Sequence, residues 1–461
     1  MIRIFSRNLI PSLLFLLLFL VSSHEVFAQT TYNLSVYIQG SGSGVVKSVP
    51  DGLVCNQNIC TGTFLANTDI TLKAVPGPGS FHTNWNGCVG RGNPCTISLF
   101  HDTNITVDFT DGFKASSINA AAIRLYFNWE DPVILNELVL RIEDVVSKKP
   151  VDIVLVPEFS LSQFEGDNQG SPPIKFSFDS YSNTFFISPN QENNRVVPII
   201  EQVQQLARDY NTYILLGTVM ENYLDENLQT FLIVDNSGSI VDLRTKHCEN
   251  CTEAYQEYSY PRIKSYTLKT QQGAFANYFF LICAEAWESP TTEAIRSKIE
   301  GSHVDLFLFP QALGDINFSA IMNAIQNGQS PDTPGWSWSW LNNYFIPIYI
   351  YERNIIKPKS YVVATDFFSE QGNAGIFQLD SNPQLLSSFD MDDPENKWVW
   401  AKIPISTLKG DLNDDNSIDV LDIMFLIQEI FKPDVNIYYD VNGDYKVNLL
   451  DIIELINIIF S

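Results

Sequence analysis

From about residue 117, short apolar segments alternate with segments whose apolar residues recur at helical spacing, and this alternation constrains the fold more than any other feature. Strands are predicted at 120–127, 152–157, 213–217, 230–235, 279–283 and 304–309, and helices at 134–146 and 197–210. Apolar strands between helical segments indicate an α/β sandwich, in which helices cover the sheets. Residues 164–195, rich in Asn, Ser and Pro, are predicted to be a surface insertion.

Residues 31 to about 110 follow a different pattern, with short alternating segments between Gly, Pro and Asn turns. Strands are predicted at 32–38, 69–75, 95–99 and 104–109. Cys55 and Cys60 lie close in sequence, as do Cys88 and Cys95, which is typical of a small unit stabilised by disulfides. The segment resembles a β-repeat module appended to exported bacterial proteins. The resemblance implies a spacer or an adhesive module, and we favour the spacer.

Residues 1–28 have the features of a secretory signal peptide: Arg3 and Arg7, an apolar run at 13–21, and the small residue Ala28. The run is too short to anchor the mature protein, and no later stretch resembles a membrane span. We therefore expect a secreted or cell-surface protein without a transmembrane anchor. The net charge of −25 excludes nucleic acid as a partner, because such a surface repels phosphate backbones.

Two acidic segments near the C-terminus repeat 29 positions apart, each before an apolar helical segment, at 423–431 and 452–460. Oxygen side chains occupy loop positions 1, 3, 5, 9 and 12, and position 7 offers a backbone carbonyl, which is how a 12-residue loop wraps a hard cation. The first loop comprises Asp411, Asn413, Asp415, Ser417, Asp419 and Asp422, and the second Asp440, Asn442, Asp444, Lys446, Asn448 and Asp451. We expect calcium in a structural role.

The duplicated loop and helix, with Asp rather than Glu at position 12, resemble a type I dockerin over residues 410–461. The resemblance implies that this segment docks onto a cohesin-type partner. Residues at loop positions 10 and 11 are the candidate contacts, namely Val420, Leu421, Leu449 and Leu450. The alternative is that these four side chains form the core of the small domain.

Three residues with reactive side chains stand at the ends of predicted strands. Cys283 ends an apolar segment before a turn, where free backbone N–H groups can bind an oxyanion. Glu158 and Lys246 each follow an apolar segment in the same way. Solvation at a sheet edge explains each charged residue alone, but together with the thiol they supply a base, an oxyanion cation and a nucleophile.

The motifs Pro157-Glu158, Lys246-His247 and Ile282-Cys283-Ala284-Glu285 resemble those of the nitrilase superfamily of carbon–nitrogen hydrolases, in the same order. The resemblance covers about residues 120–405. It implies a four-layer αββα sandwich, often a homodimer, that acts on a small amide or nitrile without a catalytic cofactor.

The same resemblance implies a role for each site residue. Glu158 takes the proton of Cys283, whose thiolate attacks the substrate, while Lys246 and the Ala284 backbone N–H stabilise the oxyanion. Water then hydrolyses the thioester. The superfamily also has a second glutamate between the lysine and the cysteine, for which Glu253 and Glu257 are the two candidates.

These features predict a signal peptide at 1–28, a β-rich module with two disulfides at 30–112, a hydrolase domain at 117–407 and a dockerin-like domain at 410–461. The expected function is an exported amidase-type thiol hydrolase with a calcium-dependent docking module. One alternative is an inactive nitrilase-like adhesion or assembly module, and another is an acyltransferase that uses the same site. Cys248 and Cys251 form a zinc half-site, a redox pair or a loop disulfide, and export favours the disulfide.

Overall fold

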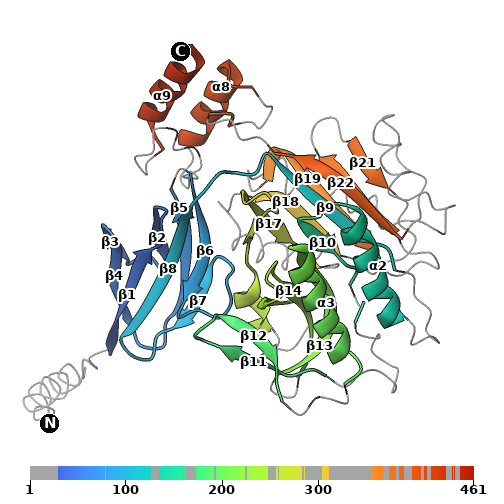
Figure 1. Cartoon of the computed structure of the whole chain (residues 1–461). Helices are drawn as coiled ribbons and strands as arrows, with labels where there is room; N and C mark the ends of the chain where they lie inside the picture. Colours follow the sequence, from blue (N-terminus) through green and yellow to red (C-terminus); the bar gives the residue numbers. More distant parts are fainter. Residues whose placement is uncertain are drawn as a thin grey trace, which may run out of the picture.

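The computed structural model (Figure 1) has three parts along the chain: an all-β module, an α/β domain and a pair of C-terminal helices. The structure describes residues 30–77, 79–125, 134–158, 160–161, 173–189, 191, 194–223, 226–247, 256–257, 259–282, 285, 304–310, 356–366, 373–379, 384–388, 397–405, 410–412, 417–431, 439, 441 and 447–460. The expected signal peptide lies outside these residues. None of the described helices has the length and apolar character needed to cross a membrane.

The N-terminal module is a β-sandwich of two sheets, with strand orders β3-β4-β1-β8-β6 and β2-β5-β7. Its strands are β1 Thr31–Gln39, β2 Gly44–Val49, β3 Val54–Asn56, β4 Ile59–Leu65, β5 Asp69–Pro76, β6 Ser80–Asn86, β7 Cys95–Ser98 and β8 Thr103–Asp111. Alternate residues of β1, Leu34 and Val36, are buried in the core around Trp85. The two expected disulfides, Cys55–Cys60 and Cys88–Cys95, are present.

Two mixed sheets form the centre of the α/β domain, with orders β11-β12-β15-β14-β13-β10-β9-β22 and β16-β17-β18-β19-β20-β21. The strands of the first sheet are β9 Ser117–Ile123, β10 Ile153–Leu155, β11 Phe176–Asp179, β12 Thr184–Ile187, β13 Tyr213–Tyr223, β14 Glu226–Val234, β15 Ile240–Thr245 and β22 Trp398–Pro404. Those of the second are β16 Tyr266–Lys269, β17 Phe275–Phe280, β18 Val304–Pro310, β19 Ile356–Asp366, β20 Asn373–Leu379 and β21 Gln384–Ser388. Helices α2 Ile134–Lys148 and α3 Val197–Tyr210 confirm the two helical segments predicted in this part of the chain.

The central strands bury side chains on both faces, which explains their continuous apolar sequences. In β10, Val154 packs with helices α2 and α3, whereas its neighbour Ile153 packs between the two sheets. On the outer face of the six-stranded sheet, Phe279 and Phe307 are also buried, so this face is covered too. The arrangement agrees with the expected four-layer sandwich, and three of its layers lie within the described residues.

The predicted surface insertion at 164–195 contains a β-hairpin. Strands β11 and β12 pair antiparallel, and Phe185 of β12 pairs with Ile240 of β15, which adds the hairpin to the edge of the eight-stranded sheet. Asn183 in the turn has a φ of 50°, a conformation that Asn tolerates better than most residues. The many polar residues of this segment concealed the two strands.

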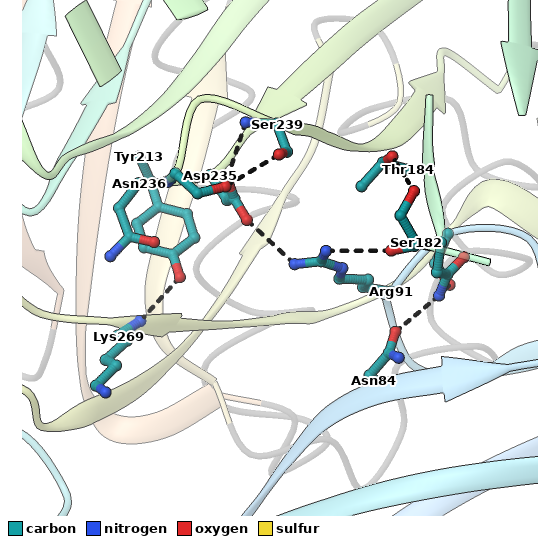
Figure 2. A network of polar contacts seen from close by, with 12 residues as sticks. Asn84, Arg91, Ser182, Thr184, Tyr213, Asp235, Asn236, Ser239 and Lys269 are labelled. Atoms are coloured by element: carbon teal, nitrogen blue, oxygen red, sulfur yellow. Dashed lines mark hydrogen bonds and ion pairs between the residues drawn. The ribbon is translucent and has the colours of Figure 1, made fainter. Parts of the chain in front are cut away.

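The N-terminal module packs against the α/β domain through loop 89–93, which the second disulfide closes. Arg91 lies between the Asp235 carboxylate and a backbone carbonyl of the β11–β12 turn (Figure 2), at 3.1 and 3.4 Å. Asn93 and Ser265 exchange two backbone hydrogen bonds of 2.9 and 2.7 Å. This fixed attachment differs from the plain spacer that the sequence suggested.

The C-terminal helices are α8 Val420–Ile430 and α9 Leu449–Phe460, and both begin three residues before the predicted helical segments. The reason is side-chain capping. Asp419 accepts a hydrogen bond from the backbone N–H of Leu421 at 2.7 Å, and Asn448 accepts one from Leu450 at 2.9 Å. The loop oxygens at position 9 therefore start the helices.

Candidate functional site

Glu158 and Lys246 lie at the same edge of the eight-stranded sheet, although 88 residues separate them in sequence. Strands β10 and β13 are parallel, β14 is antiparallel to β13, and β15 is antiparallel to β14. Strands β10 and β15 therefore run in the same direction and end at one edge. Glu158 follows β10 and Lys246 follows β15, so the topology brings together two of the predicted site residues.

The two side chains form an ion pair in which Lys246 Nζ donates to Glu158 Oε1 at 2.8 Å. The Glu158 side chain is fully buried, and that of Lys246 is 16% exposed. The other oxygen, Oε2, has no hydrogen-bond partner among the described residues. A buried carboxylate with one oxygen held by an ammonium group and the other oxygen available is suited to accept a proton.

Strand β13 passes close to the turn that carries Glu158, and Gly217 makes this approach possible. A Cβ at this position would clash with the Pro157 carbonyl oxygen and with Ser160 Oγ. The pairing of β13 with β14 shifts register in the same place, which bends the strand. The local backbone at Glu158 therefore depends on a glycine and a bulge.

Glu285, two residues after Cys283, is buried against the strand that leads to Lys246. Its Oε2 accepts a hydrogen bond from Arg244 Nη2 at 2.8 Å, and its Oε1 accepts one from the backbone N–H of His247 at 2.5 Å. Both side chains of the Arg244–Glu285 pair are fully buried. Burial raises the pKa of Glu285, and the adjacent guanidinium and backbone donors oppose that rise.

The remaining predicted site residues are not brought together by the described part of the chain. Cys283, Ala284 and Glu253 lie outside the described residues, as does the segment 248–251 with its two cysteines. Glu257 is described and is exposed, in contrast to the buried Glu158.

A second polar cluster beside Lys246 was missed by the sequence reasoning. Glu221 Oε2 accepts a hydrogen bond from Arg262 Nη1 at 2.7 Å, and the same nitrogen donates to Thr245 Oγ1 at 2.7 Å. The available signal was a charged residue inside an apolar strand, because a buried charge requires a partner. Glu221 in β13 and Arg244 in β15 both carry this signal.

His247 follows Lys246 but is not suited to act as a base. Its Nδ1 lies 2.8 Å from Ser259 Oγ, and burial, with a contribution from Arg244, lowers its pKa to about 4. The imidazole is therefore neutral near pH 7 and adds no charge beside Lys246.

The first acidic loop is closed at the start of α8. The backbone N–H groups of Leu412 and Asp419 donate to the two oxygens of Asp422, at 2.6 and 2.8 Å. Asp411, at the beginning of the loop, and Asp422, at its end, are both buried. The second loop repeats the bond from position 9 to position 12, with Asn448 N donating to Asp451 Oδ2 at 2.7 Å.

Buried carboxylates at loop positions 1 and 12 fit the oxygen ligands of a hard cation, because such groups require a compensating charge or hydrogen bonds. Ser417 is exposed. The other predicted ligands lie outside the described residues, namely Asn413, Asp415, Asp440, Asn442, Asp444 and Lys446.

Residues 409–460 match the dockerin type I domain. The dockerin resemblance of the sequence is thereby confirmed. The core of this dockerin domain consists of Leu412, Leu426, Tyr439, Val441 and Leu455. The four residues at loop positions 10 and 11 are instead between 53% and 67% exposed, so the alternative that they form the core is wrong. Further exposed apolar residues continue this face on both helices, namely Met424, Ile427 and Phe431 on or next to α8, and Ile453, Ile456 and Phe460 on α9.

The structure is similar to solved members of the nitrilase superfamily. Nit3 of Saccharomyces cerevisiae, a member of branch 10 of this superfamily, has a TM-score of 0.38 at 14% identity, over 63% of this chain and 91% of that chain. An amidase from Nesterenkonia sp. has a TM-score of 0.38 at 12% identity, over 68% and 97%. A carbon–nitrogen hydrolase from Helicobacter pylori G27 has a TM-score of 0.36 at 11% identity, over 62% and 89%. No curated protein matches the chain.

Proposed function

We propose that the protein is an exported thiol hydrolase of non-peptide carbon–nitrogen bonds, of the amidase type, which carries a calcium-dependent docking module. The observation that carries the catalytic part is the 2.8 Å pair of Lys246 and Glu158, two residues that the sequence motifs had selected independently of any geometry. Burial of Glu158 and the available Oε2 support its role as the base.

In the proposed reaction, Glu158 accepts the thiol proton of Cys283, and the thiolate forms a bond to the amide carbon. Lys246 and the Ala284 backbone N–H stabilise the negative oxygen of the tetrahedral intermediate. Glu158 then returns its proton to the nitrogen, and the C–N bond breaks to leave a thioester and free ammonia or amine. Glu158 finally takes a proton from water, which attacks the thioester. The proton then passes from Glu158 to the sulfur of Cys283 as the C–S bond breaks, which releases the carboxylic acid and restores the thiol.

Ammonia or amine release from a panel of small amides and nitriles tests this proposal, with the mature full-length chain as the enzyme. We expect activity that is lost in Cys283→Ala and retained in Cys251→Ala, a matched cysteine variant. Mass spectrometry should detect the acyl group on the peptide that contains Cys283. The catalytic proposal is wrong if no substrate reacts and Cys283→Ala leaves iodoacetamide labelling unchanged. Acyl transfer to added amines would instead identify an acyltransferase.

For the dockerin domain, we propose that the twelve loop residues named above hold two calcium ions through side-chain and backbone oxygens. The exposed apolar face of α8 and α9 is then proposed to dock onto a cohesin-type partner. Its exposure supports this, because apolar patches of this kind mark protein–protein contacts. Binding to an immobilised cohesin panel should require calcium and should be lost when Leu421 and Leu450 are both replaced by Asp. Equal binding by this variant would contradict the assigned surface.

A further inference from the structure

We propose that Glu285 is a positioning residue that fixes the backbone of Lys246 relative to the segment preceding Cys283. The inference rests on the proposed function, since it assigns Glu285 a task in the same site. The side chain of Glu285 acts through two peptide N–H groups and through Arg244.

Backbone hydrogen bonds fix the peptide groups on both sides of Lys246. Glu285 Oε1 accepts the N–H of His247, which belongs to the peptide group after Lys246. Arg244 Nη1 donates to the carbonyl of Thr245, which belongs to the peptide group before it. The Lys246 N–H itself donates to the Gln229 carbonyl at 2.9 Å. The backbone on both sides of Lys246 is therefore held, and the Arg244–Glu285 pair provides two of the three bonds.

Glu285 also binds the backbone of Ile282, the residue before Cys283 in the sequence. The backbone N–H of Ile282 donates to Glu285 Oε2 at 2.8 Å, and the backbone N–H of Glu285 donates to the Ile282 carbonyl at 3.1 Å. The first of these bonds is the one that the glutamate of a capping box makes, from the backbone N–H three residues earlier to its own carboxylate. The second is an ordinary backbone turn bond. One carboxylate thus binds a backbone donor next to Lys246 and another next to Cys283.

The task requires a carboxylate. Its two oxygens accept three hydrogen bonds, from His247 N, Ile282 N and Arg244 Nη2, and the guanidinium compensates the buried charge. A glutamine has only one oxygen, so its amide group would face either the His247 or the Ile282 N–H donor. Glu285→Gln therefore preserves the shape of the side chain while it breaks one of the two backbone links.

The test compares Glu285→Gln with Asp242→Asn in the mature full-length chain. Asp242 is a suitable control because it is also a buried carboxylate in an ion pair, 3.1 Å from Lys264 Nζ. Within the part of the chain that the structure describes, it bonds to no group next to Lys246 or Cys283. Three quantities are measured: the iodoacetamide labelling rate of Cys283 as a function of pH, kcat and KM on the best amide, and the melting temperature. We expect Glu285→Gln to lower the labelling rate and kcat by about 100-fold with little change in KM, because a small displacement of reacting groups has this effect.

Asp242→Asn should lower the melting temperature and leave both rates unchanged. The inference is overturned if Glu285→Gln likewise changes only the melting temperature. If Glu285→Gln does not fold, Glu285→Asp keeps the charge but shortens the reach, so it should fold and lose kcat, and wild-type rates in this variant would also overturn the inference. Labelling requires no substrate, so slower labelling in Glu285→Gln supports the positioning role even if the wild type hydrolyses no amide and the proposed function fails.

Discussion

Replacing Glu158 with Gln should greatly lower the catalytic rate and only slightly lower the stability of the fold. The variant is isosteric, and its amide oxygen can still accept the hydrogen bond from Lys246 Nζ, which is 2.8 Å long in the native pair. What is lost is the negative charge and with it the base. Proton transfer by a positioned side chain contributes about 10²–10⁴-fold to a rate, so kcat should fall by that factor.

The stability effect follows from the burial of the pair. At 4 Å, two unit charges attract by about 4 kcal/mol at an effective dielectric constant near 20, but most of this is offset by the cost of burying Glu158. The Lys246 side chain is 16% exposed, so water partly solvates the unpaired ammonium. A charged donor to a neutral oxygen also retains much of a hydrogen bond. The net loss should be about 1–2 kcal/mol, or roughly 2–8 °C in melting temperature.

Ammonia release and thermal unfolding, measured on the same preparations, test the expected losses of kcat and of stability. Glu137→Gln is the matched control, because Glu137 pairs with Arg141 at 2.8 Å on helix α2. This control should keep full activity and lose under about 1 kcal/mol. If Glu158→Gln retains more than about a tenth of the wild-type kcat, Glu158 is not the base, whatever its effect on stability.

Three further results are expected. The isolated segment 410–461 should show little helical circular dichroism in chelator and gain it with calcium, because its excess of eleven acidic over two basic side chains opposes folding without the cation. Equal signals in both conditions would show that the loops are ordinary turns. Burial lowers the pKa of His82 to about 3, so below pH 6.5 the unfolded chain binds a proton at His82 that the folded chain does not. His82 should therefore account for about 2 kcal/mol of the stability lost between pH 7 and pH 5, and His247, whose pKa is also lowered, should add a loss of the same sign. Urea unfolding should show that His82→Phe removes the contribution of His82 and leaves that of His247. Asn183→Ala should lower the free energy of unfolding by about 2–3 kcal/mol in the same assay. The substitution deletes the three hydrogen bonds of the Asn183 amide to the N-terminal module and places alanine at a positive φ. Asn183→Thr should not restore the stability.

The sequence predicts those features that depend on local patterns. Helices α2 and α3 follow from apolar residues at helical spacing, and strands such as β10 and β18 follow from apolar runs. The sequence also predicted that Glu158 and Lys246 belong to one site, because both residues stand where buried strands end. The position of each residue on its strand, rather than any contact, provided the signal.

The missed features depend on contacts between distant segments. Strands β11 and β12 are only four residues long, lie within a segment rich in polar residues, and join the sheet through the pairing of Phe185 with β15. The link between Arg244 and Glu285 joins residues 41 apart, and neither residue reveals its partner in the sequence. A charged residue in an apolar strand indicates that a partner is required, but only the folded chain determines which residue is that partner.

The attachment of the N-terminal module has a consequence for the α/β domain. Lys264 and Asp242 are both nearly inaccessible, and their pair is completed by the module: Lys264 Nζ also donates to the Val89 carbonyl at 2.6 Å, and the Gly92 N–H donates to Asp242 Oδ2 at 3.3 Å. Without the module, this pair would be exposed at the surface and would lose two of its hydrogen bonds. The disulfide that closes loop 89–93 holds these backbone groups in place. The module therefore contributes to the folded α/β domain as part of its structure, which a spacer would not do.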